Sequence, residues 1–172
     1  RPGSLRAVLV GDGSLHEELA GCIAAARAED SVLLAGAVPH GEVAAWLAQA
    51  DVYVSLNHLG NLSNANLEAM AAGKCMIILD ADPQTHTDTE TARLIPDGVV
   101  LRINRGDIAG NLARALESLL DAPERITFYA AAASCLGKEL LQPWDQRIEM
   151  ETDLICHLAG KDKTVPCRST AL

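Results

Sequence analysis

The sequence predicts an α/β fold in which a parallel sheet carries helices on both faces. Short apolar runs of strand length alternate with longer stretches of helix length, as in successive βαβ units. The apolar runs are nearly continuous, which is typical of strands that are buried on both faces. Glycine and aspartate recur between the segments, where turns and helix ends are expected.

The first part of the chain contains two strand-to-helix transitions. A glycine-rich turn over residues 11–14 follows the first apolar run. Ser14 is a suitable N-cap there, and Glu17 three residues later completes a capping box. We expect a strand over residues 5–10, a helix to about residue 28, a strand over residues 32–35 and a helix over residues 41–49.

An asparagine-rich segment lies between two apolar runs in the middle of the chain. The runs at residues 51–56 and 75–79 predict strands, and a helix between them ends near residue 72. Asn64 is its expected N-cap and Gly73 its expected stop. The polar loop thus follows the carboxyl end of a strand, where open α/β sheets bind ligands.

The rest of the chain predicts one more strand and four helices. Asp88 or Thr89 is expected to cap the first of these helices and Asp107 the second, and Pro143 suits the first position of the last. The expected elements are a helix to residue 94, a strand over residues 99–103, and helices over residues 107–120, 124–141 and 143–158. Residues 1–160 are expected to form one domain, and residues 161–172 a frayed tail.

Composition narrows the classes of function. The 172 residues suffice for one domain, and 49% hydrophobic with 22% charged residues is ordinary for a soluble globular protein. The net charge of −9 argues against nucleic-acid binding, which needs a basic face, but not against a small anionic ligand. Five cysteines without metal-type spacing predict reduced thiols in a cytoplasmic protein. The sequence shows no signal peptide and no apolar run long enough to span a membrane.

The polar loop and the helix after it are the best candidate site. Backbone amides around residues 61–65 at a helix N-terminus suit a phosphate group, although an ordinary capped helix has the same pattern. Glu68 can accept the two hydroxyls of a ribose, or it merely complements the helix dipole. Gly13 permits close approach of backbone to a ligand, or forms a simple tight turn.

Five segments in order resemble one known family. The segments are VLVGDGSLHEEL, LLAGAVPHGEVAAWLAQADVYVSL, NLEAMAAGKCMIILD, DTETARLIPDGVVLRI and PWDQRIEMETDLI. They resemble the C-terminal donor-binding half of retaining GT-B glycosyltransferases of the glycosyl transferase group 1 family. The resemblance covers about residues 5–158. It implies a Rossmann-like domain that is one half of a GT-B fold.

The resemblance also implies a function. The domain would bind a UDP- or GDP-linked sugar, as substrate and without a cofactor or metal, for retaining transfer of a hexosyl group. The implied contacts are Gly13, Val38, Asn61, Leu62, Ser63, Asn64 and Glu68. The acceptor, a saccharide or lipid, would be held by a separate domain, so we expect little activity from this chain alone. A role in polysaccharide biosynthesis and peripheral membrane association of the full protein are further implications.

Two departures from the family pattern bear on this interpretation. The family has two glutamates eight positions apart; Glu68 matches the second, whereas Gly60 stands where the first would be. The family's basic pair would precede Arg1, so we expect the chain to be a piece of a longer polypeptide. An exposed sheet edge or apolar face would then favour dimerisation.

Other interpretations remain open. Gly60 favours a non-catalytic nucleotide-binding or protein-interaction module with a degenerate donor site. An unrelated Rossmann-like protein that binds a mononucleotide is a third interpretation, which would show ligand contacts at Gly13 without Glu68. His58 is in the loop, but a loop histidine is usually a surface residue, and we assign no catalytic residue in this chain.

Overall fold

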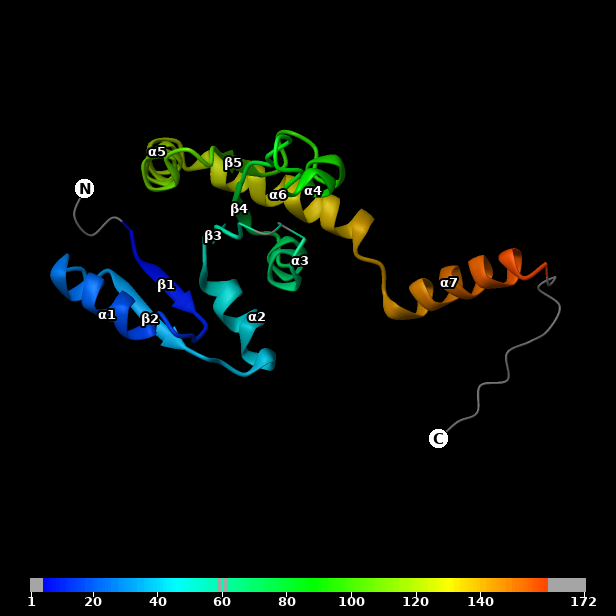
Figure 1. The fold of residues 1–172 in the computed structure, drawn as a ribbon, viewed down its shortest axis with the longest axis horizontal. Coiled ribbons are helices and arrows are strands. Elements are labelled where there is room, and N and C mark those ends of the chain that lie inside the picture. The colour runs from blue at the N-terminus through cyan, green and yellow to red at the C-terminus, as the bar shows by residue number, and fades with distance from the viewer. Residues whose placement is uncertain (1–4, 59, 61, 161–172) are drawn as a thin grey trace. The chain divides into compact units, whose positions relative to one another are not determined.

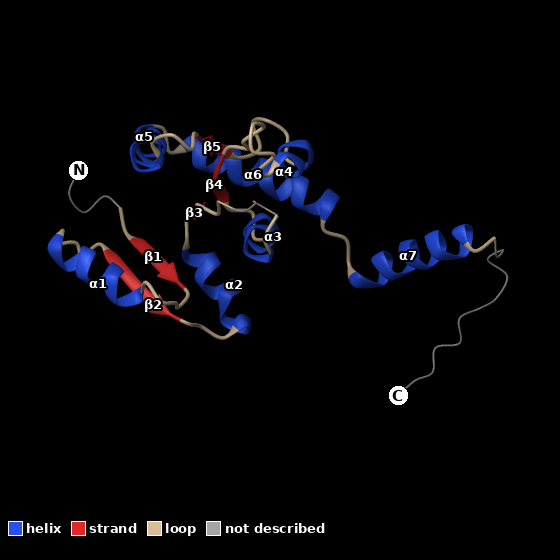
Figure 2. Cartoon of the chain, in the orientation of Figure 1, coloured by secondary structure: helices blue, strands red, loops and turns tan. Residues whose placement is uncertain are grey.

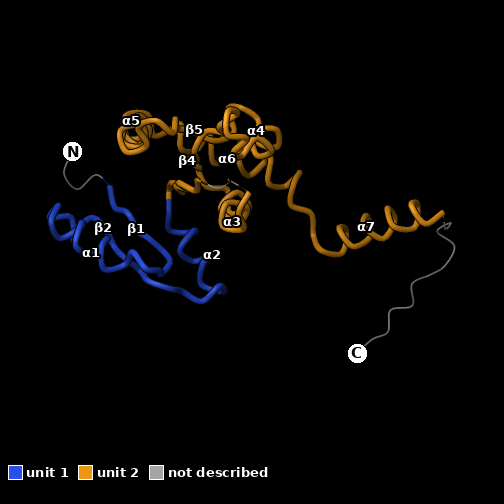
Figure 3. The backbone as a smooth tube through the Cα atoms, viewed as in Figure 1, with its two compact units in different colours: residues 1–50 blue, residues 51–172 orange. Residues whose placement is uncertain are grey.

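The computed structural model describes residues 5–58, 60 and 62–160. Five strands and seven helices follow one another along these residues (Figure 1). The chain divides into two compact units, residues 1–50 and residues 51–172 (Figure 3), and each is described by itself. All strand pairs are parallel, which confirms the predicted α/β class. The predicted tail, residues 161–172, lies outside the described residues.

The first unit is a parallel strand pair with two helices. β1 (Ala7–Val10) pairs with β2 (Val32–Gly36), and α1 (His16–Ala25) connects them, with α2 (His40–Gln49) next along the chain. The predicted capping box is wrong. The His16 amide donates to the Gly13 carbonyl at 3.1 Å, and this turn places the start of α1 beyond Ser14, so that Leu15 is the N-cap residue and no side chain caps the helix.

The second unit contains a three-stranded parallel sheet. β3 (Val52–Ser55), β4 (Cys75–Leu79) and β5 (Leu101–Ile103) lie in the order β3-β4-β5. α3 (Asn64–Ala71) connects the first two strands and α4 (Thr89–Leu94) the last two (Figure 2). Three more helices follow: α5 (Ile108–Asp121), α6 (Glu124–Leu140) and α7 (Trp144–Leu158).

The central strand β4 is the core of this unit. All five of its side chains, Cys-Met-Ile-Ile-Leu, are fully buried. Cys75, Ile77 and Leu79 form a cluster with Ile103 of β5 and Leu119 of α5, and α6 contacts both β4 and α3. Full burial stabilises an aliphatic side chain by about 1.5–3 kcal/mol, so β4 fixes the positions of its two neighbouring strands and of the helices that cover it.

Both ends of α3 are fixed by specific residues. Ser63 is the N-cap, with its hydroxyl accepting the Asn66 amide at 3.3 Å; the prediction that Asn64 caps the helix is therefore wrong by one position. Asn64 is instead the first helical residue, and it is exposed. At the other end the predicted glycine stop is confirmed, because Gly73 adopts φ +61° and its amide donates to the Met70 carbonyl at 3.0 Å.

The last described helix has an uncovered apolar surface. None of the residues of α7 is buried, and Trp144, Ile155 and Leu158 are each more than 60% exposed. Within the ranges that the structure describes, no helix combines the length and the apolar character that crossing a membrane requires.

The cap of α3 gives a first test. We expect Ser63→Ala to lower the free energy of unfolding by about 0.5–2 kcal/mol, because an amide of the first turn loses its acceptor. Asn64→Ala is the matched control, and should stay within about 0.5 kcal/mol of the wild type, since it changes an exposed helical position. Urea unfolding followed by circular dichroism measures both. A larger loss for Asn64→Ala than for Ser63→Ala would contradict this assignment.

Burial of β4 gives a second test. Burial raises the pKa of Cys75 to about 11, with the charge of Arg125 opposing the rise. Its thiol therefore stays protonated at pH 8, and only the thiolate reacts rapidly with alkylating agents. We expect iodoacetamide to label the exposed Cys22 and Cys135 well before Cys75 in the folded protein, as measured by peptide mass spectrometry. Equal labelling rates for the three would contradict the buried position.

Candidate functional site

Polar loops gather at the carboxyl end of the three-stranded sheet. The strands β3, β4 and β5 are parallel and paired, so the segments that follow them leave the sheet at the same edge. These segments begin at residues 56, 80 and 104. This is the edge at which α/β sheets bind ligands, and the predicted polar loop is the first of the three.

The N-terminus of α3 lies at the end of the first loop. Ser63 is half-buried, whereas Leu62, Asn64 and Ala65 are exposed. The helix has eight residues, and the positive end of its dipole is directed toward this loop. The structure therefore places predicted site residues Leu62, Ser63 and Asn64 together at a helix start. Asn61 lies outside the described residues.

A hydrogen bond to a buried asparagine holds α3 against β3. The Tyr53 hydroxyl donates to Asn66 Oδ1 at 2.9 Å, and Asn66 is only 1% exposed. Burial raises the pKa of Tyr53; a hydrogen bond with Ser55 opposes this rise, and the charge of Glu68 adds to it. The phenol is therefore a stable donor at neutral pH, and it fixes the helix start relative to the end of the strand.

Glu68 lies one turn into α3 and is half-buried. The charge of its carboxylate adds to the raised pKa of Tyr53 on β3. A carboxylate there accepts hydrogen bonds from neutral hydroxyl groups without competing for the exposed start of the helix.

A shallow hollow of about 330 Å³ opens beside the helix start. It is lined by Asn57, Gly60, Leu62, Ser63, Asp88, Glu90 and Thr91. Two of these residues are acidic, and Asp88 also accepts a hydrogen bond from the Thr91 hydroxyl. The hollow is thus lined by residues that follow β3 together with two carboxylates near the start of α4.

Gly60 has a backbone conformation that disfavours other residues. Its φ is +154°, and a Cβ atom added there would lie 3.6 Å from Asp88 Oδ1. A glutamate at this position would therefore be strained and would lie beside another carboxylate. The backbone conformation at residue 60 therefore favours glycine over the glutamate of the family pattern.

The other predicted contacts belong to the first unit. Gly13 is exposed, and its amide donates to Asp12 Oδ1 at 2.7 Å. Val38 is half-buried in the loop between β2 and α2. Because each unit is described by itself, the convergence of these two residues with α3 stays a prediction.

The loop after β4 is organised by Asp82. Its carboxylate accepts the Thr85 hydroxyl at 2.8 Å and the Gln84 amide at 2.9 Å. These bonds, the first being the stronger effect, lower the pKa of Asp82, so this turn stays intact at neutral pH. Among the described residues, no three His, Cys, Asp or Glu side chains are grouped as metal ligands.

The burial of Asn66 and the contacts of Arg105 were not predicted; the sequence analysis included Asn66 only as one residue of the asparagine-rich segment. Asn66 gave a usable signal, because Ala69 and Met70, three and four positions later, are apolar and mark the buried face of the helix. Arg105, in the loop after β5, gave none: its Nε donates to the Asp80 carbonyl at 2.6 Å and its Nη1 to the His58 carbonyl at 3.4 Å.

Three solved structures share the fold. HepE of Anabaena, in complex with UDP, matches with a TM-score of 0.71 at 17% identity, covering 92% of this chain and 42% of that one. Sucrose-phosphate synthase of Thermosynechococcus elongatus matches with a TM-score of 0.71 at 20% identity, and the match covers 89% of this chain and 38% of that one. A glycosyltransferase of Rickettsia africae matches with a TM-score of 0.68 at 13% identity, and the match covers 92% of this chain and 41% of that one.

The structural matches confirm the predicted fold, one half of a GT-B architecture. The chain spans about two fifths of the length of these structures. No curated protein is significantly similar to it in sequence. The family model described as glycosyl transferases group 1 matches residues 1–122, which is well over half of the chain. The chain therefore belongs to the glycosyl transferases group 1.

Proposed function

We propose that this chain is the donor-binding part of a retaining glycosyltransferase and binds a UDP- or GDP-linked sugar. The observation that carries the proposal is the exposed start of α3 at the carboxyl edge of the sheet, with Glu68 one turn further along. The UDP complex of the structurally similar HepE supports the choice of a nucleotide ligand.

The start of α3 suits the diphosphate. Its first-turn amides and the positive end of its dipole attract an anion without any net positive charge on the protein, which fits a chain of net charge −9. The Ser63 cap and the Tyr53–Asn66 bond hold these amides in place. Hydrogen-bond donors that are held in place before the reaction stabilise the negative charge that develops on a leaving phosphate.

Glu68 is assigned to the ribose. A half-buried carboxylate accepts two vicinal hydroxyl groups, and such charge-assisted hydrogen bonds are stronger than neutral ones. The proposed contact set is completed by Gly13 and Val38 of the first unit and by Asn61, Leu62, Ser63 and Asn64.

The proposed reaction transfers the sugar from the nucleoside diphosphate to an acceptor saccharide or lipid. The sugar–phosphate bond breaks and the diphosphate keeps the bonding electrons. The acceptor hydroxyl oxygen forms the new bond from the same face and gives its proton to the departing phosphate oxygen, so the anomeric configuration is retained. The acceptor is proposed to be held outside these residues.

We therefore expect the 172 residues alone to show little or no turnover, and a measured rate of transfer would contradict this part of the proposal.

A second function is favoured by one observation. Gly60 replaces the first family glutamate, in a conformation that disfavours a side chain, and the hollow beside it is lined by Asp88 and Glu90. These carboxylates oppose a bound diphosphate. A non-catalytic module with a degenerate donor site would have these features.

Calorimetric titration with UDP, GDP and ADP tests whether the chain has a working nucleotide site. We expect saturable binding of UDP or GDP, weakened about tenfold or more in Glu68→Ala, which corresponds to the loss of one charged hydrogen-bonding group. Glu139→Ala, an exposed change on α6, is the matched control and should bind like the wild type. Absence of binding to all three nucleotides would favour the degenerate module.

A further inference from the structure

We propose that Arg105 is a positioning residue that clamps the backbone after β3 at His58, and so fixes the start of α3 for the donor. This inference rests on the proposed function only in its last step, because the clamp itself is a matter of contacts within the second unit.

Arg105 connects the segments that follow all three strands. It lies two residues beyond β5, donates from Nε to the carbonyl of Asp80, the residue after β4, at 2.6 Å, and donates from Nη1 to the carbonyl of His58 at 3.4 Å. His58 is 47 positions away in sequence and belongs to the loop after β3. One side chain therefore ties together three loops at the ligand-binding edge of the sheet.

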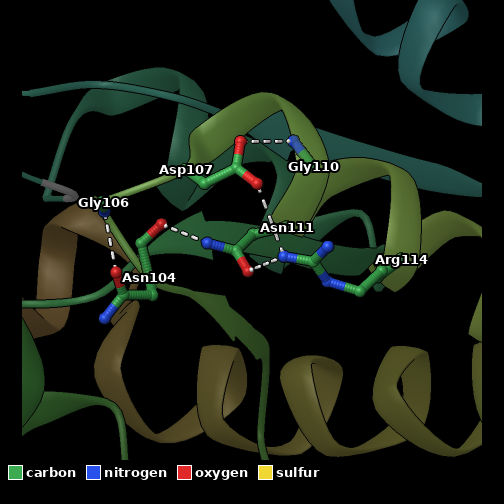
Figure 4. A network of polar contacts seen from close by, with 6 residues as sticks. All are labelled: Asn104, Gly106, Asp107, Gly110, Asn111 and Arg114. Carbon is green, nitrogen blue, oxygen red and sulfur yellow. Dashed lines mark hydrogen bonds and ion pairs between the residues drawn. The ribbon is translucent and has the colours of Figure 1, made fainter.

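The backbone that carries Arg105 is itself held on both sides (Figure 4). Asn104 accepts the Gly106 amide on its side chain at 2.7 Å and the Asn111 amide group on its carbonyl at 2.9 Å. Asp107 accepts the Gly110 amide at 3.0 Å, and a Cβ atom at Gly110 would collide with that carboxylate. The clamp thus has a rigid base in the turn between β5 and α5.

Between β3 and α3, the described residues His58 and Ser63 are held by different means. Ser63 caps α3, whereas Arg105 holds the carbonyl of His58. A guanidinium donates in a fixed planar fork, so two carbonyls bound to it also keep a fixed separation. Its charge reaches this edge as well, since Arg105 contributes, after Thr85 and Gln84, to the lowered pKa of Asp82.

Arg102 provides a matched control. It lies on β5, is also half-buried, and also donates to a backbone carbonyl, from Nη2 to Ile95 at 2.8 Å. Each of the two arginines has one buried guanidinium nitrogen without an acceptor among the described residues. Arg102 forms its ion pair with Asp97, at 3.9 Å, and its hydrogen bond goes to Ile95 at the end of α4 rather than to the loop after β3.

The test compares Arg105→Met, Arg105→Lys and Arg102→Met with the wild type. Backbone ¹⁵N relaxation measures the order parameters of the loop amides, with thermal unfolding of each variant measured in parallel. We expect the loop order parameters to fall below about 0.6 in Arg105→Met and to keep wild-type values in Arg102→Met. Arg105→Lys should be intermediate, because an ammonium group keeps the charge but lacks the planar fork.

Titration with UDP tests the functional step. We expect Arg105→Met to bind UDP about tenfold more weakly than Arg102→Met, because binding must then also order the backbone that Arg105 no longer holds. The clamp is overturned if the loop is equally ordered in the two methionine variants, or already disordered in the wild type. The positioning role is overturned if Arg105→Met loosens the loop but binds UDP like the wild type. If the wild type binds no UDP, GDP or ADP, the proposed function fails, and the relaxation data alone support or overturn the clamp.

Discussion

The complete burial of β4 is the constraint on which the second unit depends. Its five side chains are shielded from solvent, and a strand buried on both faces must be covered by neighbours on every side. β3 and β5 supply its backbone partners, and α5 and α6 supply apolar contacts. The ends of the three strands are then fixed, and the loops that follow them are brought to one edge by geometry rather than by their own sequences.

Polar contacts fix the positions of the loops that follow the three strands. The sheet places three loops together, but their positions depend on a few bonds between distant residues: Tyr53 to Asn66, and Arg105 to Asp80 and His58. These bonds involve a buried amide and two backbone carbonyls rather than paired charges.

Much of this arrangement was predictable from the sequence, for physical reasons. The run Cys-Met-Ile-Ile-Leu predicts a buried strand, Gly73 a helix stop and Asp107 a helix cap, and all three are confirmed. The errors at Ser14 and Asn64 have one cause: a cap depends on where the preceding turn closes, and neighbouring polar residues compete for that position. Arg105 could not be found, because its partners lie 25 and 47 residues away.

The uncovered apolar surface of α7 has a consequence for the protein as a solute. Trp144, Ile155 and Leu158 present apolar groups to water, and molecules that carry such groups attract one another at short range. The net charge of −9 opposes this through repulsion between like-charged molecules. Because that repulsion is screened over about 8 Å at physiological ionic strength, the colloidal stability of this chain depends on salt, and concentrated samples keep best in dilute buffer well above the isoelectric pH.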